Sequence, residues 1–200
     1  MILEKYTKYK RPSKSYLYEI LCEDINNELK KNKKINFIDF ACGNAKLLNK
    51  FNFKSYTGVD LDKKKILINK DNFPEHYFFN ENISNFINNN EYDVACCTET
   101  FGFNKHFDST EIIKTLYNIL KSIKTNGSFY FNIHKEIYLN NNDELNNFFN
   151  LFEKHELIYY GNFTSKRNIF SHKILFFSEK LCSSYLNIGE YIYIKCKGLK

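Results

Sequence analysis

Short apolar segments alternate with amphipathic ones along most of the chain, and this alternation constrains the fold more than any other feature. Five apolar segments are expected to form buried strands: residues 35–40, 56–59, 76–79, 92–98 and 128–133. Helices are expected where apolar side chains recur at helical spacing, over residues 15–29, 47–51, 63–69, 112–123 and 143–154. Strands that alternate with helices predict βαβ units sharing one parallel sheet.

The C-terminal part differs because strand-like segments follow one another there. Residues 157–160, 169–177 and 191–195 are expected to be strands, and they predict an antiparallel hairpin that closes the sheet. Two hundred residues with 43% hydrophobic content are enough for one domain with a substantial core. We therefore expect residues 1–200 to form a single domain, with residues 1–14 as an N-terminal arm or lid.

Charge and cysteine content exclude several classes of protein. The net charge is +6, but the lysines are scattered in short runs, which is typical of a solvated surface. No apolar run is long enough to span a membrane, and the N-terminus lacks the layout of a signal peptide. The six cysteines show neither a CxxC pair nor zinc spacing. These features predict a cytoplasmic protein with reduced thiols, no membrane partner and no metal site.

A turn rich in small residues follows the first expected strand. It contains Gly43 at its centre, and Asp60 ends the next strand about twenty positions further on. Small residues let the backbone approach a ligand closely, and a carboxylate at this position can accept hydrogen bonds from two ribose hydroxyls. The arrangement predicts a nucleotide-type cofactor.

A dinucleotide is the weaker choice of cofactor. The GxGxxG fingerprint would need glycine at positions 41, 43 and 46, whereas the chain has Ala41, Gly43 and Lys46. A lysine at the third position disfavours the close helix packing and the pyrophosphate seat that NAD requires. A P-loop is also disfavoured, because the sequence has no GxxxxGK[ST] motif.

Four landmarks in order resemble the class I S-adenosylmethionine (SAM)-dependent methyltransferases. Asp39-Phe-Ala-Cys-Gly-Asn-Ala45 is similar to the first motif of that family, and Tyr56-Thr-Gly-Val-Asp60 to its second acidic motif. Residues 92–103 resemble its fourth strand and following loop, and residues 120–127 its LKPGG segment. The resemblance covers residues 35–155. It implies an α/β fold, a three-layer Rossmann-like sandwich with a mostly parallel seven-stranded sheet, with SAM as cofactor and S-adenosylhomocysteine (SAH) as product.

The resemblance also implies a cofactor site, residue by residue. Asp39 would orient the amino group of SAM, and the turn of Ala41, Cys42 and Gly43 would pass close to its methionine part. Asp60 would hold the ribose, with Leu61 against the adenine. Asn82 and Ile83 would meet the adenine, and Thr98 would lie beside the transferred methyl. The chain departs from the family pattern where Ala41, Ala45 and Asn126 replace motif glycines.

A general base matters only if the methyl acceptor is a hydroxyl or an ammonium. The candidates are Glu99, His106 and His134. His134 ends the fifth expected strand, at the edge where open α/β sheets bind ligands. Each candidate also has a plainer interpretation as a capping or solvated side chain.

The acceptor is less constrained. The segment after the fourth strand lacks the Pro-Pro-Tyr motif of adenine amino-methylases, and no Pro-Cys pair indicates cytosine-C5 chemistry. A small-molecule or sugar-type acceptor is favoured, with O- and N-methylation both open. An RNA or protein methyltransferase, supported by the charge of +6, and a non-catalytic SAM-binding interaction protein stay as alternatives. Nucleic acid is thus an open but disfavoured partner, and the sequence does not indicate an oligomeric state.

Overall fold

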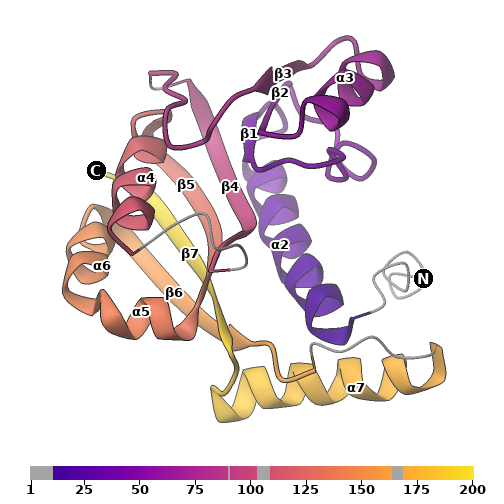
Figure 1. The fold of residues 1–200 in the computed structure, drawn as a ribbon, viewed down its shortest axis with the longest axis vertical. Coiled ribbons are helices and arrows are strands. Elements are labelled where there is room, and N and C mark those ends of the chain that lie inside the picture. The colour runs from indigo at the N-terminus through magenta and orange to yellow at the C-terminus, as the bar shows by residue number, and fades with distance from the viewer. Residues whose placement is uncertain (1–10, 90, 103–108, 164–168) are drawn as a thin grey trace.

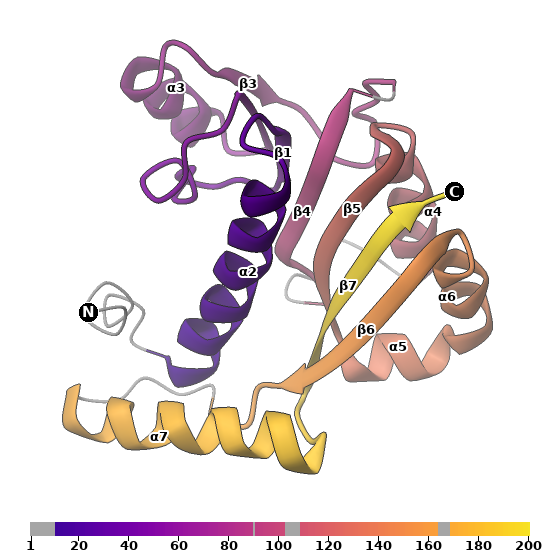
Figure 2. The ribbon, with the colours of Figure 1, turned by 180° about the vertical axis from the view of Figure 1, so that it is seen from behind.

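The computed structural model describes residues 11–89, 91–102, 109–163 and 169–200. Its centre is a seven-stranded sheet with the order β3-β2-β1-β4-β5-β7-β6 (Figures 1 and 2). The strands are β1 (Asn36–Phe40), β2 (Ser55–Asp60), β3 (Tyr77–Asn80), β4 (Tyr92–Phe101), β5 (Ile123–His134), β6 (Phe152–Tyr160) and β7 (Tyr191–Leu199). β1 to β5 pair in parallel, whereas β7 is antiparallel to both of its neighbours. The predicted fold class is confirmed.

Helices cover both faces of the sheet, which gives three layers. On one face α2 (Pro12–Lys31) and α3 (Lys63–Asn72) share a core with side chains such as Phe37 and Tyr56. On the other face α4 (Ser109–Leu120) and α6 (Asn142–Phe149) pack on Phe40 and Phe131. The short helix α5 (Lys135–Asn140) connects β5 to α6. Figure 1 shows α4, α5 and α6 together on one side and α2 on the other.

The helix starts near the first three strands follow ordinary capping rules. Pro12 lies in the first turn of α2, where its missing N–H costs no hydrogen bond. Asp62 caps α3, and its carboxylate accepts hydrogen bonds from the main-chain N–H of Lys64 at 3.1 Å and of Lys65 at 3.3 Å. Because Asp62 follows β2 directly, this cap fixes the path of the chain just beyond Asp60.

One predicted strand is wrong. Residues 169–177 lie in α7 (Ile169–Leu181), which continues into a π-helical turn at Cys182–Leu186. β6 and β7 therefore pair antiparallel as predicted, but a helix crossing the start of α2 separates them in the chain (Figure 2). The buried side chains of this segment recur at helical spacing: His172, Phe176, Glu179 and Ser183. Three of them are polar, so the hydrophobic pattern did not show the period.

Buried hydrogen bonds attach α7 to the start of α2. The carboxylate of Glu179 accepts from the hydroxyl of Ser13 at 2.6 Å and from the main-chain N–H of Gly161 at 2.7 Å. The hydroxyl of Ser15 lies 3.1 Å from the Nε2 atom of His172. α7 and the loop after β6 thus fix the first turn of α2.

Several predicted boundaries also differ. Residues 47–51 form consecutive turns rather than a helix, and the predicted 143–154 helix is shorter because β6 begins at Phe152. α4 ends at Leu120, so residues 123–127, predicted as a helix end, already belong to β5. Asn126 has a left-handed φ of 64°, which asparagine tolerates better than other residues, and the pairing of β4 with β5 shifts register there. Residues 12–14 of the possible arm belong to α2, and residues 1–10 lie outside the described residues.

The described residues include no helix with the length and apolar character needed to cross a membrane. All six cysteines are free thiols, and Cys96 and Cys97 are fully buried in β4. The prediction of reduced cysteines is consistent with both observations.

Candidate active site

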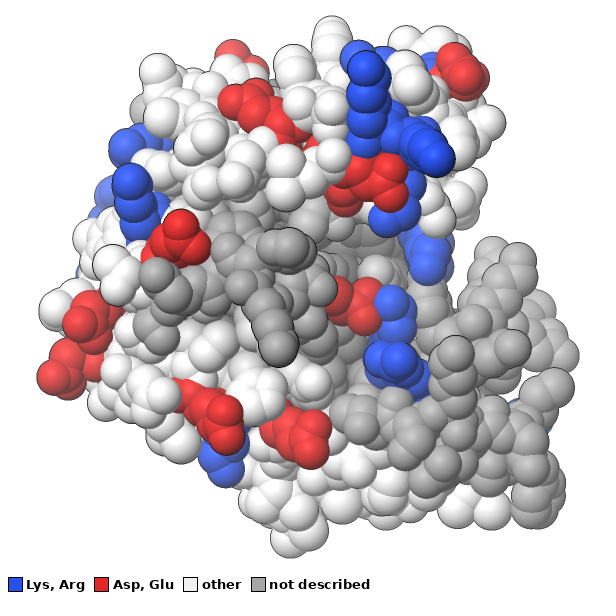
Figure 3. All heavy atoms as spheres, in the orientation of Figure 1, with Lys and Arg blue, Asp and Glu red and all other residues white. Residues whose placement is uncertain are grey.

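A cavity of about 930 Å³ lies at the carboxyl ends of β1, β2 and β4, and α2 forms one of its walls. Every residue predicted to touch the cofactor lines it: Asp39, Ala41, Cys42, Gly43, Asp60, Leu61, Asn82, Ile83 and Thr98. Glu99 lines it as well. Acidic and basic side chains lie next to one another around this hollow in the space-filling view (Figure 3). The fold therefore brings together residues that are up to 60 positions apart in the sequence.

The turn after β1 is built from left-handed residues. Ala41, Gly43 and Ala45 have φ values of 61°, 53° and 46°. L-residues with a side chain reach this region only at a cost, which explains why the family motif has glycine at all three positions. A Cβ atom on Gly43 would meet no atom within 4 Å, so the missing side chain leaves open space beside the backbone. The alanines preserve the path of the turn.

Asp60 links this turn to the segment after β2. One oxygen of its carboxylate accepts from the N–H of Gly43 and the other from the N–H of Asp62, both at 2.8 Å. Asn69 of α3 donates to the carbonyl of Gly43 at 2.8 Å. The carboxylate is thus oriented before any ligand arrives, and each oxygen keeps capacity for a further hydrogen bond.

Asp39 is the buried acid of the site. Tyr56 donates to its Oδ2 atom at 2.7 Å, and the thiol of Cys96 lies 3.1 Å from Oδ1. Burial raises the pKa of Asp39 to about 6, although the two donors act in the opposite direction. Burial also raises the pKa of the Cys42 thiol far above its usual range. Cys42 is therefore a packing residue of the turn and a poor nucleophile.

The other end of the cavity has an apolar wall. Ile83 is buried in the core, whereas the side chain of Leu61 is 64% exposed beside Asp60. Asn82 orders the backbone around Ile83, because its side-chain oxygen accepts hydrogen bonds from both the N–H and the hydroxyl of Ser84. Thr115 of α4 closes this end, and its buried hydroxyl has no hydrogen-bond partner among the described residues. An apolar wall with one unpaired hydroxyl suits a heteroaromatic ring.

Glu99 lies at the end of the cavity nearest α2. Its φ of 59° is left-handed, which is unusual for a glutamate. Its main-chain N–H donates to the side-chain oxygen of Asn132 at 2.7 Å, and Asn132 in turn donates to the hydroxyl of Tyr160 at 2.6 Å. Both supporting side chains are buried. The sequence analysis missed them because they lie on β5 and β6, where nothing in the local pattern marks them.

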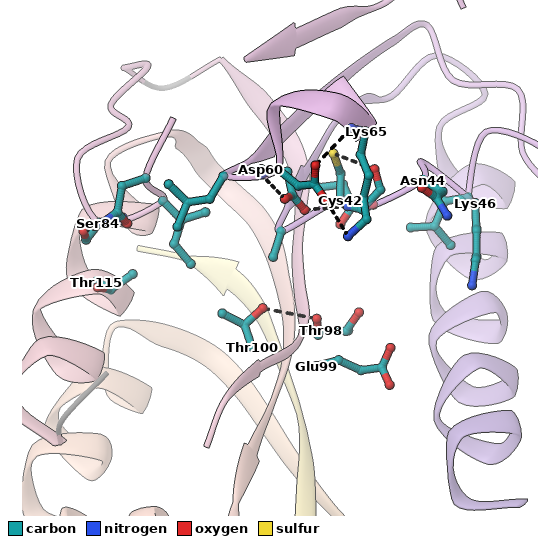
Figure 4. Close-up of a pocket in the computed structure, with 18 of the residues that line it drawn as sticks. Cys42, Asn44, Lys46, Asp60, Lys65, Ser84, Thr98, Glu99, Thr100 and Thr115 are labelled. Atoms are coloured by element: carbon teal, nitrogen blue, oxygen red, sulfur yellow. Dashed lines mark hydrogen bonds and ion pairs between the residues drawn. The ribbon is translucent and has the colours of Figure 1, made fainter. Parts of the chain in front are cut away.

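Two lysines that the sequence analysis did not assign to the site also line the cavity. Lys14 in the first turn of α2 forms an ion pair with the carboxylate of Glu99. Lys46 was used only as an argument against NAD, yet its side chain projects into the same space (Figure 4). Burial and the nearby charge of Lys14 lower the pKa of Lys46. Because this end of the cavity has two lysines and only one glutamate, it favours the binding of a ligand that carries an anionic group.

His134 is not among the residues that line the described cavity. His134 lies at the carboxyl end of β5 as expected, but its Nδ1 atom accepts from the N–H of Glu136 at 3.3 Å and so caps α5. Its ring packs edge-on against Tyr191 with 5.2 Å between the centroids. His106 lies outside the described residues.

Residues 13–171 match a family model described as a methyltransferase domain. The chain belongs to this methyltransferase family. The predicted membership of the class I SAM-dependent methyltransferases is thereby confirmed, and SAM is the cofactor of that class. No curated protein matches the sequence of the chain.

Solved structures similar to this methyltransferase share its fold at low sequence identity. The plantazolicin methyltransferase BpumL, solved with a triazolic desmethylPZN analog and SAH, is 15% identical with a TM-score of 0.61, over 100% of this chain and 90% of its own. The N-methyltransferase NodS from Bradyrhizobium japonicum is 10% identical with a TM-score of 0.60, over 92% and 97% of the chains. A TehB-like SAM-dependent methyltransferase from Corynebacterium glutamicum is 15% identical with a TM-score of 0.54, over 82% and 80%.

Proposed function

We propose that this methyltransferase transfers the methyl group of SAM to an oxygen or nitrogen nucleophile of a small-molecule or sugar-type acceptor. The observation that carries the proposal is the single cavity that all nine predicted cofactor residues line. Its volume of about 930 Å³ exceeds what a cofactor of that size requires and leaves room for a small acceptor. The SAH-bound relative with a natural-product analog supports an acceptor of this class.

The residues of the cavity fit the parts of SAM in order. Asp60 would hold the ribose hydroxyls, with Leu61 and Ile83 on either side of the adenine. The backbone of Ala41 and Gly43 would run beside the methionine part, and Asp39 would face its ammonium. Lys14 and Lys46 would hold the methionine carboxylate, because both line the cavity beside Glu99.

Bound SAM supplies an activated methyl group, whose bond to sulfur breaks with the electron pair staying on sulfur. The chain then has to align the acceptor and exclude water, since no strong acid or metal is needed. Glu99 would orient an acceptor and take its proton, with Thr98 beside it. His134 and His106 stay as further candidates for the base. The Nδ1 atom of His134 is already used in the cap of α5.

Two measurements test the proposal. Calorimetry should detect SAM and SAH binding to the wild-type chain, and the Asp60→Ala variant should bind both more weakly. SAH release should then be followed with a panel of small amines, alcohols and amino sugars, and with short RNA and peptides. Turnover confined to RNA or peptides would replace the proposed acceptor class, and binding without any release would identify a non-catalytic SAM-binding protein.

A further inference from the structure

The ion pair between Lys14 and Glu99 connects two elements that face each other across the acceptor end of the cavity. Lys14 belongs to the first turn of α2, and Glu99 to the carboxyl end of β4. Both side chains are about 30% exposed: 28% for the lysine and 30% for the glutamate. The carboxylate thus holds an alkylammonium group, at a depth that a ligand can still reach from solvent.

The surrounding structure holds the carboxylate of Glu99 in a defined position. A left-handed conformation is costly for a glutamate and persists only where its surroundings hold it. Here Asn132 accepts the N–H of Glu99, and Asn132 is fixed by the buried hydroxyl of Tyr160. A surface ion pair would not need such support, because exposed pairs contribute little to stability. The support indicates that Glu99 is aimed at a ligand.

We infer that the acceptor is an amine whose ammonium replaces Nζ of Lys14 against the carboxylate of Glu99. This deepens the proposed function and rests on it. Lys14 has an alternative partner once SAM is present, because the methionine carboxylate would lie between Lys14 and Lys46. Glu99 is then left without its internal cation and requires another. A neutral alcohol would leave that half-buried carboxylate unpaired, which is costly.

The proton balance also fits an amine. The acceptor enters as an ammonium and gives one N–H proton to the Glu99 carboxylate, which exposes the nitrogen lone pair that forms the new N–CH₃ bond. The product leaves as a methylated ammonium, and Glu99 releases the extra proton to solvent. Glu99 therefore acts as both the cation site and the proton acceptor, and Asn132 and Tyr160 are positioning residues.

Cation binding can be measured without knowing the natural acceptor. In the Lys14→Ala variant, methylammonium chloride should shift the amide resonance of Glu99 in a saturable way, and methanol should not. The Lys14→Ala/Glu99→Gln double variant is the matched control and should show no saturable shift. The inference is overturned if methylammonium gives no saturable shift in Lys14→Ala, or if the double variant responds equally.

Turnover gives a second, separate test. With matched acceptors such as ethanolamine and ethylene glycol, or glucosamine and glucose, SAH release should require the amine. Glu99→Gln should lower kcat/KM for the amine at least about a hundredfold while SAM affinity stays within about twofold. A protein that binds SAM but releases SAH only with alcohols, or with none of these amines, contradicts the amine inference alone. If the wild-type protein does not bind SAM, the proposed function itself is contradicted.

Discussion

The carboxylate of Asp60 accepts the main-chain N–H of Gly43 at 2.8 Å, so the turn after β1 and the end of β2 are held together before any cofactor binds. Asp60 is therefore both a ligand of the proposed ribose site and a brace for the turn beside it. This dual role shapes how its variants should behave.

Asp60→Ala should weaken SAM binding more than about tenfold, which corresponds to about 1.4 kcal/mol or more, without unfolding the chain. The variant removes the acceptor of the ribose hydroxyls and loosens the Gly43 turn. Calorimetry gives the affinity, and a thermal melt reports folding. Asp71→Ala, at an exposed acid in α3, is the control and should bind SAM normally. An unchanged affinity in Asp60→Ala would remove Asp60 from the cofactor site.

Asp39 should make stability fall as the pH rises from about 4 to about 6. Its pKa is raised from 3.8 to about 6, so the folded chain binds its proton more tightly than the unfolded chain does. The folded state is therefore favoured at low pH, and the contribution is lost once the pH exceeds the folded pKa, by about 3 kcal/mol at most. Urea unfolding of wild type and Asp39→Asn between pH 4 and 7 checks this. The difference between the two should vary with pH, and a constant difference would refute the shift.

Gly43→Ala and Ala41→Gly should move stability in opposite directions. Both residues are left-handed, so a new methyl at position 43 costs about 1 kcal/mol, and removing the one at position 41 gains somewhat less because glycine favours the unfolded chain. The Cβ of Gly43→Ala would also enter open space beside the proposed methionine site, so SAM affinity should fall. Denaturant midpoints and calorimetry measure both effects. Equal stabilities for the two variants would show that the turn is not strained.

Asn132→Leu should lower turnover at least about tenfold while SAM affinity changes less than about twofold. The variant releases the backbone of Glu99 and leaves the buried hydroxyl of Tyr160 without its donor, which costs about 1–3 kcal/mol of stability. Tyr160→Phe removes the support of Asn132 but leaves its hydrogen bond to the N–H of Glu99 possible, so it should lower turnover less. If the two variants reduce stability but leave acceptor kinetics unchanged, the pair is structural only.

His134→Ala should reduce turnover less than Glu99→Gln does, because His134 caps α5 and is not a lining residue of the described cavity. Loss of the cap should cost about 1 kcal/mol of unfolding free energy. SAH release under saturating SAM compares the two variants directly. A larger loss in His134→Ala would make this histidine the base.

Most of the residues that line the cavity near β1 and β2 could be predicted from the sequence, because the motifs that mark them are local. The Gly43 turn and Asp60 follow from short motifs whose geometry one strand–turn–helix unit determines. The acceptor side was missed because Asn132, Tyr160 and Lys14 meet only through the sheet order. α7 was mistaken for a strand since two of its buried residues, His172 and Glu179, are polar. Their burial depends on partners in α2 and in the loop after β6, which no window of sequence contains.

β7 is the last strand of the sheet in sequence, yet it lies between β5 and β6. During synthesis, β6 has no neighbouring strand among the described elements until residues 191–199 have left the ribosome. The cofactor turn depends on β1 and β2 and can form while the C-terminal third is still being made. The brace that orients Glu99 cannot, because Asn132 and Tyr160 are held at their distance by that final strand. A nascent chain would thus form the turn that Asp60 holds well before the support of Glu99 is in place.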